Sequence, residues 1–280
     1  MDRGAVATAE ELPPPLPGAR PWTKTRMFGA VLMGFWIALG IGIIAFLVSG
    51  FETDFFMRYG PRMLRGLWVT IELVVISIIL GAAFALPVAL ARMSTNRLPA
   101  TISYAYVYYF RGTPLLAQTF LVYYGAGQFA PFLKDVGMWW FFREAFYCAA
   151  FTFTLNTAAY QAEIFRGAIQ AVPRAQIEAG MSVGMRAIPI FLRVTLPQAL
   201  IVALRPFGNE VIFMIKGSAI AGIVTVFDLM GETRLAFSRS FDFQVYIWAA
   251  LLYLVMVETL RRVWERLEHR LTRHLRYDHE

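Results

Sequence analysis

Residues 27–51, MFGAVLMGFWIALGIGIIAFLVSGF, form an apolar run that contains no charged residue. At about 1.5 Å per residue, a helix of this length crosses the roughly 30 Å hydrocarbon core of a bilayer. The run is too long and too rich in glycine for a cleaved signal peptide, and no small-residue cleavage site follows it cleanly. It therefore predicts a membrane-spanning helix.

The composition of the whole chain agrees with a membrane fold. The 280 residues are 58% hydrophobic and only 16% charged, against about 25% charged in an ordinary soluble domain. Such a chain has too few polar side chains to cover a water-facing globule. The single cysteine, Cys148, excludes a disulfide framework and a cysteine-rich metal site. The three histidines, at 269, 274 and 279, exclude a histidine-based catalytic site in the apolar part of the chain.

Further apolar runs predict further spans. They cover residues 67–91, 101–124, 145–162, 198–215 and 243–260. The segment 217–227 is apolar but too short to cross, so we expect a re-entrant or buried segment there. The fold class is therefore an all-α, multi-pass membrane protein with about six transmembrane helices.

The placement of lysine and arginine orients these spans. Alternate connections, at residues 1–26, 92–100, 166–197 and 261–280, carry sixteen of these residues, and the connections on the opposite side carry seven. Because cytoplasmic loops are enriched in positive charge, both termini and the 166–197 loop are expected in the cytoplasm. The net charge of +7 is therefore read as membrane topology, and nucleic acid is not an expected partner.

Residues 163–197, EIFRGAIQAVPRAQIEAGMSVGMRAIPIFLRVTLP, form a polar loop between apolar segments. Glu178-Ala179-Gly180, then Gly184, then Val194-Thr195-Leu196-Pro197 follow the spacing E-A-A, three residues, G, nine residues, I-x-L-P. Small residues at Ala179 and Gly180 let a short helix approach a partner closely, and Gly184 lets the chain turn out of it. The alternative is an ordinary basic loop held by lipid head groups.

This loop resembles the EAA loop of ABC importer permeases, which docks onto the ATPase subunits. Gly180 replaces the usual second alanine, and Val194 replaces the isoleucine. The resemblance implies that coupling to the ATPase involves the following residues: Glu178, Ala179, Gly180, Gly184 and Pro197.

Five other motifs sharpen the resemblance to the polar-amino-acid group of these permeases. They are FRGTPLLAQ at 110–118, FTLNTAAY at 153–160, EIFRGAI at 163–169, and LPQAL at 196–200 followed by GNEVI at 208–212. The chain looks most similar to the subunits that import histidine, lysine, arginine and ornithine, or opines. The resemblance implies a five-helix type I permease core at 64–262. It leaves a Pro-rich cytoplasmic leader at 1–26, an additional helix at 27–51 and a basic cytoplasmic tail at 263–280.

Glu210 is the first candidate for the substrate pathway. It lies about 20 Å along a helix from Pro197, and a carboxylate at that depth is costly unless it is paired or faces water. The alternative is a structural ion pair with Lys216 or Arg205. Glu72 competes for the same role, although it is expected near the outer end of its span.

Three more polar residues are candidate pathway residues: Asn209, Arg111 and Thr113. Pro114 either begins a new helix, with Arg111 at the cytoplasmic interface, or kinks one long helix and frees backbone groups to line the pathway. Asn156 is expected to hydrogen-bond between helices.

The chain contains no G-x-x-x-x-G-K-[ST] phosphate-binding loop and no nucleophile–base or metal-ligand arrangement. We therefore expect a transport subunit of the bacterial inner membrane with no catalytic residue, metal or cofactor of its own. The resemblance implies two partner ATPases that use ATP and Mg²⁺, a second identical or homologous permease subunit and an external substrate-binding protein. The amino-acid substrate and membrane lipid complete the expected partners. The alternative is a stand-alone secondary transporter or channel, but no internal duplication is visible.

Overall fold

The computed structural model describes residues 23–50 and 53–273. The chain divides into two compact units, Met1–Phe51 and Glu52–Glu280. Residues 1–22 of the expected leader and residues 274–280 of the expected tail lie outside the described part of the chain.

The first unit contains α1, which runs from Lys24 to Ser49 and corresponds to the expected helix at 27–51. The helix begins at Thr23, whose Oγ1 accepts a hydrogen bond from the backbone N–H of Arg26 at 3.3 Å. Apolar side chains point in every direction around the helix, and almost all of them are exposed within this chain. A helix that is apolar on all sides is suited to a lipid environment.

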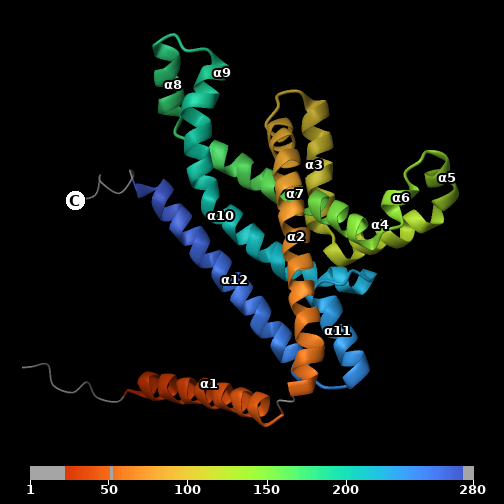
Figure 1. The fold of residues 1–280 in the computed structure, drawn as a ribbon. Coiled ribbons are helices and arrows are strands. Elements are labelled where there is room, and N and C mark those ends of the chain that lie inside the picture. The colour runs from red at the N-terminus through yellow and green to blue at the C-terminus, as the bar shows by residue number, and fades with distance from the viewer. Residues whose placement is uncertain (1–22, 51–52, 274–280) are drawn as a thin grey trace, which may run out of the picture. The chain divides into compact units, whose positions relative to one another are not determined.

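Helices make up the regular structure of the described part of the second unit (Figure 1). They are α2 (Thr53–Arg92), α3 (Arg97–Gly112), α4 (Leu115–Gln128), α5 (Ala130–Asp135), α6 (Trp139–Phe142), α7 (Ala145–Gln170), α8 (Arg174–Ser182), α9 (Ala187–Ile190), the π-helical turn η1 (Phe191–Thr195), α10 (Leu196–Gly217), the 3-10 helix η2 (Ser218–Val224), α11 (Leu229–Ser240) and α12 (Gln244–Leu271). The predicted all-α class is confirmed.

The packing of α2 against α7 forms the centre of this unit. Leu73 and Phe153 are completely buried there. Gly81 lets the two helices approach closely, because a Cβ at this position would lie 2.5 Å from Cγ2 of Thr157. The hydroxyl of Ser77 donates to the carbonyl of Ala150 across the same contact, at 3.4 Å. Small residues and a hydroxyl at a helix contact are typical of membrane proteins.

The helix α2 is longer than the predicted span at 67–91, because it begins at Thr53. Glu72 lies near the middle of this 40-residue helix, and its expected place near the outer end of the span stays a prediction. Its side chain is exposed.

The predicted interruption at residues 111–114 divides the chain into two helices. Thr113 has extended backbone angles (φ −118°, ψ 147°) and ends α3, and Pro114 precedes the first residue of α4. This arrangement agrees with a helix that starts at Pro114 and differs from one long kinked helix. The physical reason is that proline disfavours the helical conformation in the residue before it.

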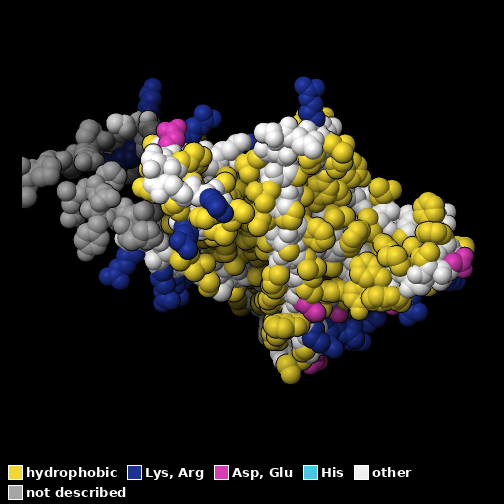
Figure 2. Space-filling view, turned by 90° about the horizontal axis from the view of Figure 1, so that it is seen from above, with side chains coloured by type: hydrophobic (Ala, Val, Ile, Leu, Met, Phe, Trp, Pro, Cys, Tyr) yellow, Lys and Arg dark blue, Asp and Glu magenta, His cyan; other side chains and the backbone are white. Residues whose placement is uncertain are grey.

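Four stretches in the described part of the chain are long and apolar enough to cross a membrane: Lys24–Ser49, Thr53–Arg92, Ala187–Val224 and Gln244–Leu271. The α3–α4 pair and α7 occupy the positions of the other two predicted spans. Figure 2 shows hydrophobic side chains over much of the face seen from above. Many large hydrophobic side chains are exposed along the described helices, as expected for a protein that is surrounded by lipid.

Candidate functional site

Within the 163–197 loop, α8 and α9 form a helical hairpin. This hairpin projects beyond the N-terminal end of α10 (Figure 1). Its first helix, α8, follows Pro173. Gly184 has a φ of +79°, a conformation that glycine adopts without steric cost. The N–H of Gly184 donates to the carbonyl of Met181 at 2.9 Å, and the N–H of Met185 donates to the carbonyl of Gly180 at 3.0 Å. These bonds form a glycine-terminated helix end, so the chain turns at Gly184 as the sequence predicts.

The side chains predicted to meet a partner are divided between the outside and the inside of this hairpin. Glu178 and Ala179 are exposed, but Gly180 is buried. A Cβ on Gly180 would lie 3.1 Å from Cγ1 of Ile190. The small size of Gly180 therefore allows the close packing of α8 onto α9, and its close approach to a partner stays a prediction.

The hairpin is tied to the first turn of α10. The amide of Gln198 donates to the side-chain carbonyl of Gln176 on α8 and, at 2.9 Å, to the backbone carbonyl of Val194. Pro197 lies in the same turn and is exposed. The connection from α9 to α10 is helical throughout, with the π-helical turn between them. A displacement of the hairpin would thus be transmitted directly to α10.

Glu210 lies on α10 and faces α7. It is 8% exposed, and its Oε1 accepts a hydrogen bond from Thr157 Oγ1 at 2.8 Å. The amide of Gln161 donates to the same threonine oxygen at 3.1 Å. The predicted alternative of an ion pair with Arg205 is not formed within the described chain, because Arg205 pairs with Glu268 on α12. Lys216 also makes no ion pair with Glu210 in the described residues.

A cavity of about 580 Å³ opens beside this carboxylate. Its polar lining comes from α7 and α10 and consists of Asn156, Tyr160, Asn209 and Glu210, and its apolar lining includes Phe213 and Met214. The structure thus brings together two of the predicted pathway residues, Asn209 and Glu210. An acidic side chain in a cavity with amide and phenol groups can receive a cation and hydrogen-bond its neighbours.

Side-chain hydrogen bonds connect the residues on the two sides of the break between α3 and α4. Thr113 Oγ1 donates to the carbonyl of Tyr109 at 2.8 Å. The amide of Gln118 donates to the carbonyl of Phe110 at 2.9 Å and to Thr113 Oγ1 at 2.7 Å. Asn156 Nδ2 donates to the same Phe110 carbonyl and to Gln118 Oε1, both at 3.0 Å. The backbone carbonyls of Tyr109, Phe110 and Thr113 therefore accept hydrogen bonds within the protein, and Asn156 bridges helices as predicted.

A second cavity, of about 330 Å³, lies between α2, α3 and α7. Arg111 lines it, together with Arg92, Tyr160 and Glu163. Glu163 is 2.7 Å from Arg166 Nη2 and 3.1 Å from Arg92 Nε. Glu163 has no role that could be predicted from the sequence, because Arg92 is 71 positions away and no local pattern indicates this pairing.

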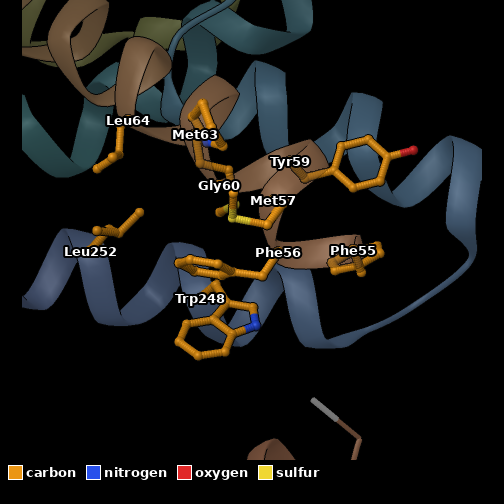
Figure 3. Close-up of a pocket in the computed structure, with 10 residues that line it drawn as sticks. Phe55, Phe56, Met57, Tyr59, Gly60, Met63, Leu64, Trp248 and Leu252 are labelled. Carbon is orange, nitrogen blue, oxygen red and sulfur yellow. The ribbon is translucent and has the colours of Figure 1, made fainter. Parts of the chain in front are cut away.

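A third cavity has a different character. It has a volume of about 300 Å³ and lies between the first parts of α2 and α12. Figure 3 shows Phe56 and Met57 of α2 facing Trp248 and Leu252 of α12. No charged residue lines this cavity, so it has no side chain that would form an ion pair with a charged ligand. Glu72 lines none of these three cavities.

Comparisons with known proteins agree on the kind of protein that this chain resembles. Residues 74–273 match the family model described as binding-protein-dependent transport system inner membrane component. The chain is 40% identical over 217 residues to the nopaline transport system permease protein NocM of Agrobacterium fabrum, covering 77% of this chain and 90% of that protein. It is 34% identical over 212 residues to the histidine/lysine/arginine/ornithine transport system permease protein HisM of Escherichia coli K12, covering 75% and 89%.

A similar fold is found in a crystal structure of an amino acid ABC transporter with histidines. The TM-score is 0.69 and the sequence identity is 32%. The similarity covers 79% of this chain and 99% of that chain.

Proposed function

The chain belongs to the family of binding-protein-dependent transport system inner membrane components and is a permease subunit of an ABC transporter, and we infer that it forms part of an ATP-driven importer for cationic amino acids or opines. The similarity to a nopaline permease and to a histidine, lysine, arginine and ornithine permease supports this substrate class. The stand-alone transporter considered from the sequence is disfavoured by this family membership.

The position of Glu210 is the observation that carries the proposed substrate class. A carboxylate in the membrane is costly, by about 2.5–3.5 kcal/mol on insertion scales for aspartate, and it is normally retained where it faces a cavity or a pathway. Glu210 borders the 580 Å³ cavity and makes no ion pair within the described chain. An ammonium or guanidinium group entering this cavity would supply the missing countercharge. Asn209, from the same turn of α10, would hydrogen-bond the entering substrate.

The hairpin of α8 and α9 supplies the proposed site of coupling. Glu178 and Ala179 are exposed on α8 and would contact a cytoplasmic ATPase. Gly184 forms the turn between α8 and α9, and Pro197 lies in the first turn of α10, where the hairpin is attached. ATP and Mg²⁺ would bind to that ATPase, which supplies the energy of transport. Closure of two ATPase subunits would move the hairpin, and the helical connection through η1 would carry that movement to α10 and Glu210.

The proposed orientation places the hairpin and both termini in the cytoplasm of a bacterial cell. The excess of lysine and arginine in the connections on that side supports it. We further propose that the complete importer contains a second permease subunit, identical or homologous, and an external substrate-binding protein. In this arrangement, access to the cavity alternates between the two sides of the membrane.

Reconstitution into proteoliposomes tests the proposal. The permease is purified with the subunits that accompany it, and uptake of labelled arginine is measured in the presence of the binding protein, with and without internal ATP. Uptake is expected only with ATP and with an ATPase subunit present. Concentration of arginine by vesicles that hold this chain alone would contradict the proposal.

A further inference from the structure

Three arginines surround a single carboxylate where α2, α3 and α7 meet. Arg166 and Arg92 already occupy the two oxygens of Glu163. Arg111 comes only within 4.0 Å of Glu163, which is beyond hydrogen-bond distance. Three positive charges thus face one negative charge, and the local excess is positive.

Arg111 is the most exposed arginine of this cluster, and its guanidinium has unused hydrogen-bonding capacity. Its side chain is 44% exposed, compared with 19% for Arg92. In the described part of the chain, no side chain or backbone carbonyl accepts a hydrogen bond from its guanidinium. Its recorded contacts are the distant Glu163 carboxylate and the ring of Tyr160, whose centroid lies 5.1 Å from Cζ. Five N–H donors in a planar fork are suited to a carboxylate.

Tyr160 connects this guanidinium with the Glu210 cavity. Its side chain lines both the 330 Å³ cavity that contains Arg111 and the 580 Å³ cavity that contains Glu210. A cation-binding carboxylate and an anion-binding guanidinium therefore face cavities that share one aromatic wall.

We propose that Arg111 binds the carboxylate of the transported amino acid while Glu210 receives its cationic group. This inference rests on the proposed function and deepens it, because it assigns both charged ends of a zwitterionic substrate to named residues. Arg92 and Arg166 position the site, since they neutralise Glu163 and leave the Arg111 guanidinium available. An exposed guanidinium without the Glu210 cavity beside it would fit a lipid phosphate equally well, and the shared Tyr160 wall favours the substrate.

Equilibrium binding to the purified permease–ATPase complex tests the assignment with three ligands. L-arginine carries both groups, agmatine lacks the carboxylate, and L-citrulline lacks the guanidinium charge. The wild-type complex is expected to bind arginine about tenfold or more tightly than agmatine, because hydrogen bonds to charged groups have this magnitude. In Arg111→Gln this preference falls to about twofold or less. Arg111→Lys keeps a point charge without the fork and is expected to retain an intermediate preference.

Arg97→Gln is the matched control, because Arg97 is exposed at the opposite end of α3 and lines none of the three cavities. It should leave the preference for arginine over agmatine unchanged. Recovery of the intact complex on size-exclusion chromatography establishes that each variant is folded.

The outcomes separate this inference from the proposed function. An unchanged arginine-to-agmatine preference in Arg111→Gln, or an equal loss of all three ligands, would overturn the carboxylate site. If Arg111→Gln leaves the arginine-to-agmatine preference unchanged while Glu210→Gln abolishes the preference for arginine over citrulline, the proposed function stands and the inference fails. A wild-type complex that binds agmatine as tightly as arginine would also reject the inference.

Discussion

Thr157 on α7 donates a hydrogen bond to Glu210 on α10, with 2.8 Å between Oγ1 and Oε1. These two residues are 53 positions apart in the sequence and meet at the wall of the cavity proposed to receive substrate. The bond holds one oxygen of the carboxylate and leaves the other available. Thr157 is itself fixed, because the amide of Gln161 donates to it and Gly81 packs against its methyl group.

Replacement of Thr157 by valine should therefore destabilise the permease and disturb Glu210. The change removes the hydroxyl and preserves the shape, so a buried carboxylate loses its donor at a cost of about 1–3 kcal/mol. Thermal unfolding of the purified complex should show a lower midpoint, and arginine uptake should fall severalfold.

Thr154 provides the matched control for this change. It lies on the same helix, and its buried Oγ1 has no hydrogen-bond partner among the described residues. Thr154→Val removes a buried hydroxyl that makes no hydrogen bond within the described residues. The midpoint of thermal unfolding of this variant should therefore equal or exceed that of the wild type. Equal losses in the two variants would mean that the bond to Glu210 contributes nothing.

Replacement of Glu210 by glutamine should reduce transport of cationic substrates. The amide retains the shape and the hydrogen-bonding capacity of the side chain but removes the charge, so uptake of labelled arginine should fall by about tenfold or more. Uptake is measured in cells that express the complete transport system. Glu144→Gln is the control. Glu144 is exposed, lies immediately before the first residue of α7 and pairs with its neighbour Arg143. Arginine uptake that is the same in both variants would reject the proposed role of Glu210.

Replacement of Gly184 by valine should weaken the coupling to the ATPase without preventing membrane insertion. A β-branched residue at a φ of +79° is strained by about 1–2 kcal/mol or more, so the turn between α8 and α9 must change. The amount of ATPase that co-purifies with the permease should decrease. Gly167→Ala serves as the control, since a Cβ there meets no atom within 4 Å. Normal recovery of the ATPase with Gly184→Val would contradict the role given to this turn.

Features that depend on local sequence were predictable. Apolar runs with few charges marked the membrane helices, because unpaired charge is costly in the bilayer. Pro114 marked the break between α3 and α4, and Gly184 marked a turn that needs a positive φ. Each of these signals is contained in a few consecutive residues.

The first part of α2 was not predicted as helix because it contains three arginines. Arg58, Arg62 and Arg65 follow the spacing i, i+4, i+7, which places them on one side of a helix. Tyr59 and Met63 are buried on another side. A count of charges indicates a loop in this segment, whereas their helical spacing indicates an amphipathic extension of the span.

The partners of the site residues could not be predicted from one sequence. Glu163 meets Arg92 from a distant helix, and Glu210 meets Thr157 only because α10 crosses α7. The burial of Gly180 against Ile190 likewise depends on the fold of the hairpin. The sequence could identify these residues as polar or small, but only the packing of the helices assigns their contacts.

We propose that α8 contacts a cytoplasmic ATPase and passes its movement to the permease. Cysteine cross-linking tests this contact directly. Cys148 is the one native cysteine and is buried, so Ala179→Cys in a Cys148→Ser background gives a single exposed thiol. A short bifunctional cross-linker should join this thiol to the ATPase in inverted membrane vesicles, and an impermeant maleimide should not label it in intact cells. Labelling from outside the intact cell, with no cross-link to an ATPase, would contradict the account.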